Sequence, residues 1–145
     1  MVHALKETWR VSGAHLLDIR PRLGEPQVIV RDRDGRDTIC GGLHWNGDDP
    51  EGHPHAEAAL SRVVAEGLFT VVAEKQFDWI DAFESVDELV ESVGEEWESR
   101  NLGEEAALKL MRTMETAGRG AVPFIRQPIG IRLLKKVDSA LSGTK

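Results

Sequence analysis

The chain of 145 residues is long enough for one globular domain, and its 41% hydrophobic and 30% charged residues are ordinary for a globular protein. Its formal net charge of −7 argues against nucleic-acid binding through phosphate neutralisation. The N-terminus lacks the apolar segment of a signal peptide, and no apolar run is long enough to span a membrane. A lone cysteine, Cys40, excludes an internal disulfide. We therefore expect a soluble, cytoplasmic protein that binds neither nucleic acid nor membranes.

The first half of the chain predicts a helix at residues 3–11, a strand at 15–20 and two further strands at 27–31 and 38–45. The helix is expected to bury the face that carries Val2, Leu5 and Trp9. Asp34-Gly35, between the last two strands, is the strongest hairpin signal in the chain. Gly41-Gly42 lies inside a strand pattern and indicates a bulge or a close approach of the backbone.

The second half predicts a helix at 54–66, a strand at 69–80, helices at 86–97 and 104–116, and a strand at 128–137. Ser85 and Glu88 form a capping box at the start of the second of these helices. The predicted inward faces of the last two helices are Val86, Leu89, Val90, Val93 and Trp97, and Ala107, Leu110, Met111 and Met114. Residues 46–54 are expected to be a loop, and residues 138–145 a flexible tail.

The most specific pattern lies near the N-terminus. The helical segment Ala4–Val11 is followed by the break Ser12-Gly13-Ala14 and by the run His15–Pro21. This order resembles the passage of class I S-adenosylmethionine-dependent methyltransferases in which "L-x-E-x-x-R-V-L-K-P-G-G" leads into a strand reading "L-L-L-D-x-R-P". The chain departs from that pattern at Ser12-Gly13-Ala14, where the family's longer loop is shortened. In the family a long segment precedes this point and carries the cofactor site. The resemblance therefore implies the C-terminal part of a methyltransferase without its cofactor-binding half.

The element order and the resemblance together predict an α+β fold, or a truncated α/β fold, in one domain at residues 1–137. Strand 15–20, helix 54–66 and strand 69–80 form a candidate βαβ unit, with the hairpin inserted within it. In the methyltransferase fold the final strand lies antiparallel between the two preceding strands, and strand 128–137 is long and apolar enough to do the same. We expect a mixed sheet with helices packed on it.

A glycine turn for the family's cofactor is missing from the sequence. Such a site needs glycines after a strand and a carboxylate for the ribose. Gly41-Gly42 lies within a strand pattern, and Gly118-Arg119-Gly120 follows a helix, where it is typical of a C-terminal cap. We therefore expect no S-adenosylmethionine site and no other cofactor. No catalytic residue is assigned, because no serine lies in a recognisable hydrolase motif.

Four residues are candidates for ligand binding. Asp18 and Arg20 end the first strand, where open α/β sheets place their ligands, and the alternative is a surface ion pair. Trp45 and Trp79 flank loops, where an indole ring can stack on a flat ligand.

His53 and His55, with acidic neighbours, are candidate ligands for a divalent metal ion. The surrounding loop lacks a cysteine and a histidine pair one helical turn apart, and polar loops commonly contain such residues. We therefore assign no metal.

Three functions remain open at this point. The one we prefer is a non-catalytic, methyltransferase-like module for binding or interaction. The alternatives are a small-molecule-binding α+β domain, or a subunit that completes a split methyltransferase. The chain on its own is not expected to be an enzyme. Because the apolar strand 15–20 lacks the neighbour that a complete methyltransferase supplies, we also expect a homodimer, besides a small-molecule ligand or a partner protein.

Overall fold

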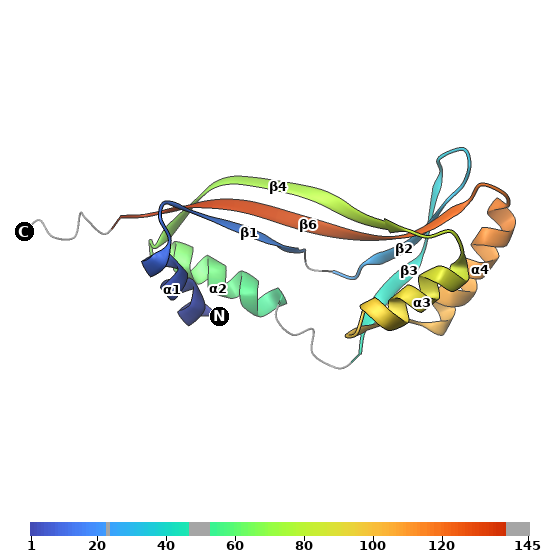
Figure 1. Cartoon of the computed structure of the whole chain (residues 1–145), viewed down its shortest axis with the longest axis horizontal. Coiled ribbons are helices and arrows are strands. Elements are labelled where there is room, and N and C mark those ends of the chain that lie inside the picture. Colours follow the sequence, from blue (N-terminus) through green and yellow to red (C-terminus); the bar gives the residue numbers. More distant parts are fainter. Residues whose placement is uncertain (23, 47–52, 139–145) are drawn as a thin grey trace, which may run out of the picture. The chain divides into compact units, whose positions relative to one another are not determined.

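The computed structural model describes residues 1–22, 24–46 and 53–138, with the side chains of residues 53 and 54 left aside. Figure 1 shows the elements in this part of the chain: α1 (Val2–Val11), β1 (His15–Pro21), β2 (Gln27–Arg31), β3 (Asp37–Trp45), α2 (His53–Ala65), β4 (Phe69–Ala82), α3 (Val86–Glu96), β5 (Arg100–Leu102), α4 (Glu104–Ala117) and β6 (Val122–Lys136). The α+β class is confirmed. None of the helices in the described part is long and apolar enough to cross a membrane.

The strands form a sheet in the order β1-β6-β2-β3-β5, and β4 also pairs with β6. β6 is antiparallel to β1 and to β2. It is antiparallel to β4 as well, because Val137 donates its N–H to the carbonyl of Leu68 while Phe83, at the other end of β4, donates to Pro123. β6 therefore lies between β1 and β4, as predicted for the last strand. The prediction of a mixed sheet is wrong, because the hydrogen-bonded strand pairs of the described part are antiparallel. The strands β1 and β4 of the βαβ unit run parallel to each other, with β6 between them.

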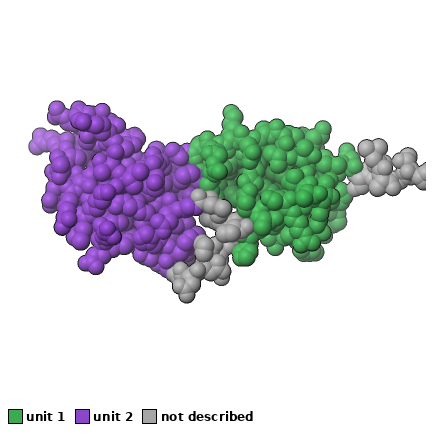
Figure 2. Space-filling view, turned by 180° about the vertical axis from the view of Figure 1, so that it is seen from behind, with its two compact units in different colours: residues 1–23, 50–77, 129–145 green, residues 24–49, 78–128 purple. Residues whose placement is uncertain are grey.

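The chain divides into two compact units, which Figure 2 colours separately. Unit 1 comprises residues 1–23, 50–77 and 129–145, and unit 2 comprises residues 24–49 and 78–128. Each unit is assembled from stretches that are far apart in the sequence, and β4 and β6 contribute residues to both. Residues 139–145 of the expected tail and residues 47–52 of the expected loop lie outside the described part.

The core of unit 1 forms where α2 packs on the sheet. Its buried side chains are Leu60, Val63, Phe69 and Leu134, and Trp9 of α1 packs against them. The predicted apolar face of α1 is thus confirmed, with Val2 and Leu5 in the same cluster. The opposite face of β1 is open, since the side chains of Leu17 and Ile19 are 55% and 57% exposed.

The core of unit 2 is enclosed by β2, β3, α3 and α4, and its fully buried members include Val28, Leu43, Leu89, Leu110 and Ile125. The Ser85 half of the predicted capping box of α3 is confirmed, because the Glu88 N–H donates to Ser85 Oγ at 3.1 Å. The Glu88 carboxylate accepts from the backbone N–H of Glu84 at 2.7 Å, one residue before the N-cap, rather than from that of Ser85.

Two residues that were predicted to face the core are exposed, because each helix packs against the core along a narrower line than its apolar pattern suggests. Val90 of α3 and Met111 of α4 are 45% and 50% exposed. On α4 the side chain of Ala106 is buried instead, against β3. Helical periodicity allows a wide apolar stripe, but each helix packs against the sheet along a narrower line.

Both predictions for Gly41-Gly42, a bulge and a close approach of the backbone, are confirmed. The register between β2 and β3 shifts after Val28, which pairs with Gly41, and leaves Cys40 as the extra residue of a bulge. Gly41 has a φ of +156°, and a Cβ at this position would lie 2.6 Å from the Cβ of Ala106. α4 therefore packs directly on the backbone of β3.

Two elements differ from the sequence prediction. β5 was not expected, because its three residues are too few for a periodic pattern. β6 begins at Val122 rather than at residue 128. Pro123 has no N–H, but its carbonyl accepts a hydrogen bond from Phe83, so the strand tolerates it.

Candidate functional site

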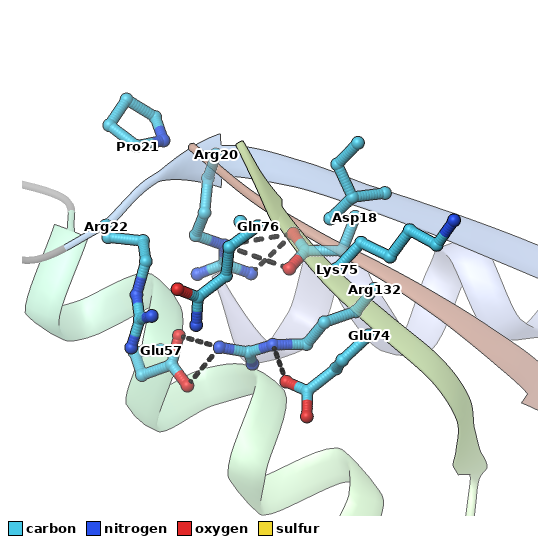
Figure 3. Close-up of a pocket in the computed structure, with 11 residues that line it drawn as sticks. Asp18, Arg20, Pro21, Arg22, Glu57, Glu74, Lys75, Gln76 and Arg132 are labelled. Carbon is cyan, nitrogen blue, oxygen red and sulfur yellow. Dashed lines mark hydrogen bonds and ion pairs between the residues drawn. The ribbon is translucent and has the colours of Figure 1, made fainter. Parts of the chain in front are cut away.

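A pocket of about 540 Å³ lies in unit 1, beside α2 and over β1, β4 and β6 (Figure 3). Its cationic side chains are Arg20, Arg22, Lys75 and Arg132. Its carboxylates are Asp18, Glu57 and Glu74. Pro21 and Ile131 are its apolar members, so the lining is predominantly polar.

The pocket lies where the helix-facing surface of the sheet changes from apolar to charged. In order toward the pocket, the residue pairs of β1 and β6 are Leu16 with Leu134, Asp18 with Arg132, and Arg20 with Gly130. Leu134 is buried in the core, whereas Gly130 has no side chain to fill the space beside α2. A Cβ at position 130 would lie 3.6 Å from Cγ of Arg22, so the Arg22 side chain passes over this glycine. The missing side chain of Gly130 leaves room for the pocket.

Asp18 and Arg20 form an ion pair in the pocket wall. Nη2 and Nε of Arg20 donate to Oδ1 of Asp18 at 2.7 and 3.0 Å, and the two side chains are only 17% and 16% exposed. The ion pair that the sequence offered as the alternative is therefore present, but it is largely shielded from solvent. Nη1 of the same guanidinium is buried and has no hydrogen-bond partner among the described residues.

Arg132 joins three elements around the pocket. Its Nη2 donates to the two carboxylate oxygens of Glu57 on α2 at 2.7 and 2.8 Å, and its Nε lies 2.9 Å from Oε1 of Glu74 on β4. Burial alone lowers the pKa of Arg132, but the hydrogen bonds that Arg132 donates to Glu57 and the charges of Glu57, Glu74 and Asp18 outweigh it and raise the pKa above its ordinary value. Arg132 therefore stays cationic at any physiological pH.

Arg22 and Lys75 differ from the other two cations of the pocket. No hydrogen bond or ion pair connects either side chain to another residue in the described part of the chain. Four cations against three carboxylates leave the lining with a net charge of +1, in a protein whose net charge is −7. The pocket is therefore a locally cationic site on an acidic protein.

The structure places the two candidate tryptophans in unit 2, and neither lines the pocket. The guanidinium carbon of Arg100 lies 3.9 Å from the ring centre of Trp45, and burial lowers the pKa of this arginine. The ring of Trp79 lies 6.2 Å from that of Trp97. Of the four predicted ligand-binding residues, the structure brings together Asp18 and Arg20.

Sequence reasoning missed Arg22, Glu57, Glu74 and Arg132. Glu57 and Arg132 are far apart in the chain, and their contact depends on how α2 packs on β6. A local signal was nevertheless available in the last strand, because Gly130 and Arg132 interrupt the apolar run of residues 129–134. In a buried strand, a glycine two residues from a charged residue lies on the same face and indicates missing volume beside a group that needs a partner.

Of the two candidate metal ligands, only His55 has a described side chain, and it is not among the residues that line the pocket. The side chain of His53 and the acidic residues Asp48, Asp49 and Glu51 lie outside the described residues. His55 is described, and the described residues contain no group of three or more His, Cys, Asp or Glu side chains placed to hold a metal ion.

No protein-family model matches the chain, and searches of curated proteins and of solved structures gave no match either.

Proposed function

We propose that the chain is a non-catalytic binding module that holds a small polar molecule in the unit 1 pocket. The observation that carries this proposal is Nη1 of Arg20, a buried guanidinium nitrogen without an acceptor in the pocket wall. An unsatisfied buried donor costs about 1–3 kcal/mol, and a ligand recovers this free energy when a shift of the Arg20 side chain brings the enclosed Nη1 to an acceptor on the ligand. The described lining contains no Ser, Cys or His, and its three carboxylates are held in ion pairs, which supports binding rather than catalysis.

We test this function by titrating the isotope-labelled protein with a panel of small polar compounds and following its backbone amide signals. Binding is expected to shift the amides of residues 18–22, 74–76 and 130–132. The substitution Gly130→Leu fills the space beside Arg22 and is expected to abolish these shifts. The control is Gly94→Leu, since nothing lies within 4 Å of a Cβ at that position. Shifts confined to other parts of the protein, or none with any compound, would contradict the proposal.

The methyltransferase-like ancestry and the cytoplasmic location remain part of this proposal. The ancestry is supported by β6, which lies antiparallel between β1 and β4 in the order that the resemblance implies. The same observation favours a second candidate function, a subunit that completes a split methyltransferase. The two are separated by calorimetry with S-adenosylmethionine: the isolated module is expected to show no saturable binding, and saturable binding would favour the split enzyme.

We also propose that the module is a homodimer formed through β1. β1 ends the strand order and pairs only with β6 in the described part of the sheet, and its outward residues Leu17 and Ile19 are exposed. An apolar edge strand of this kind readily pairs with a second copy. Light scattering is expected to give a mass near twice 16.1 kDa, and Ile19→Lys is expected to reduce it to the monomer mass. The control Ile39→Lys, on β3, is expected to leave the mass unchanged, and a monomeric wild-type protein would refute the proposal.

A further inference from the structure

We infer that the ligand of the unit 1 pocket is a monoanionic carboxylic acid with a polar, hydroxylated remainder, and that Arg22 binds its carboxylate. This inference rests on the proposed function, because it names the class of molecule that the same pocket takes.

The ion pairs of the pocket determine which charge a ligand brings. Asp18 is paired with Arg20, and both Glu57 and Glu74 are paired with Arg132. Each carboxylate therefore already has a cationic partner, although Glu57 and Glu74 share one guanidinium and keep one negative charge between them. Arg22 and Lys75 have no acidic partner among the described residues, and their two positive charges exceed this one negative charge, so the pocket is positive overall. Electrostatic complementarity selects an anion.

Both unpartnered cations line the pocket, and Arg22 is the one suited to binding a carboxylate. Its side chain lies against Gly130, and in Figure 3 it extends toward the end of Glu57 on α2. In the same view the Lys75 side chain extends in the direction away from Arg22. The planar guanidinium offers two parallel N–H groups to a carboxylate, a geometry that the lysine ammonium lacks.

The net charge of the lining favours one negative charge over two. Four cations and three carboxylates leave +1, which a monoanion balances. A phosphate monoester carries up to two charges, and it would place the second of them near Glu57 and Glu74. The rest of the ligand meets a polar surface that includes the Gln76 amide and the Glu74 carboxylate, of which Oε2 has no hydrogen-bond donor among the described residues. Hydroxyl groups satisfy such acceptors, whereas an apolar remainder would leave them desolvated.

The experiment uses three probes that share a six-carbon hydroxylated chain and differ in charge, on the full chain: gluconate, sorbitol and sorbitol 6-phosphate. Gluconate is expected to shift the pocket amides saturably and more tightly than the phosphate, and sorbitol is expected to cause no shift. Arg22→Gln is expected to weaken gluconate binding roughly tenfold or more, because it removes the charge-assisted hydrogen bonds to the ligand carboxylate. Arg33→Gln, an exposed arginine of unit 2, is the matched control and is expected to leave binding unchanged.

The possible results show whether the ligand class, the role of Arg22 or the proposed function is wrong. Tighter binding of sorbitol 6-phosphate, or equal binding of sorbitol, overturns the carboxylate assignment. An unchanged gluconate affinity in Arg22→Gln overturns the role of Arg22. Failure of all three probes while other polar compounds shift the pocket amides overturns this inference alone, and failure of the whole panel overturns the proposed function as well. Arg22 is exposed and unpartnered in the described part of the chain, so its variant is expected to unfold at the wild-type urea midpoint.

Discussion

Leu134→Ala is expected to lower the free energy of unfolding by about 2–5 kcal/mol. Leu134 is fully buried in the middle strand of unit 1, in one cluster with Leu60, Val63 and Phe69. Truncation removes apolar contacts from all three neighbours and leaves a cavity that α2 and the sheet fill only in part. The change is measured as a shift of the urea midpoint at unchanged slope.

Leu108→Ala is the matched control for this substitution. Leu108 lies on α4 and is 46% exposed, and alanine is a good helix former. Its loss is therefore expected to stay within roughly 0.5 kcal/mol. Equal losses for the two variants would show that the described face of β6 is not the one that packs against α2.

Gly41→Ala is expected to destabilise the protein by about 2–4 kcal/mol. Two effects combine at this position. The φ of +156° is a backbone conformation that residues with a side chain rarely adopt, and the new Cβ would lie 2.6 Å from the Cβ of Ala106. Either the bulge or the packing of α4 must shift. Urea unfolding measures the loss, and Gly94→Ala in α3 serves as the control. Nothing lies near a Cβ at Gly94, so alanine there is expected to stabilise the helix by about 0.5–1 kcal/mol.

The double variant Gly41→Ala/Ala106→Gly separates the two effects. Ala106→Gly alone introduces a helical glycine, which costs about 1 kcal/mol. If the close contact contributes, the double variant loses less than the sum of the two single losses, because the shortened residue 106 makes room for the new Cβ. Additive losses would show that the cost at Gly41 comes from the backbone conformation alone.

The sequence predicted those features of this chain well that depend on interactions between residues only a few positions apart. The Ser85 cap and the Asp34-Gly35 turn lie where the sequence placed them, because each depends on side chains and φ angles of immediate neighbours. The extended start of β6 was missed for the opposite reason. A strand that contains Pro123 is stable because of the partners on both sides of it, which no local pattern reveals.

The inward faces of α3 and α4 show how much helical periodicity predicts about which side chains are buried. It identified Leu89 and Leu110, which are fully buried, and it also included Val90 and Met111, which are exposed. An apolar stripe shows which side of a helix is able to pack. The width of the line that does pack depends on the surface opposite, and here part of that surface is the backbone of Gly41.

The sequence by itself determined that this protein is an α+β chain with helices α1 to α4, a cap at Ser85 and a last strand apolar enough to be central, because these properties follow from short-range sterics and hydrophobic pattern. It also singled out Asp18 and Arg20, two residues apart on one face of a strand. Only the tertiary structure decided that Arg132 holds Glu57 and Glu74, and that Arg22 is left without a counter-charge among the described residues. The physical reason is the range of the interactions. Alternation within a strand sets which residues share a face, whereas the charge balance of a pocket depends on which helix and strands the chain brings together there.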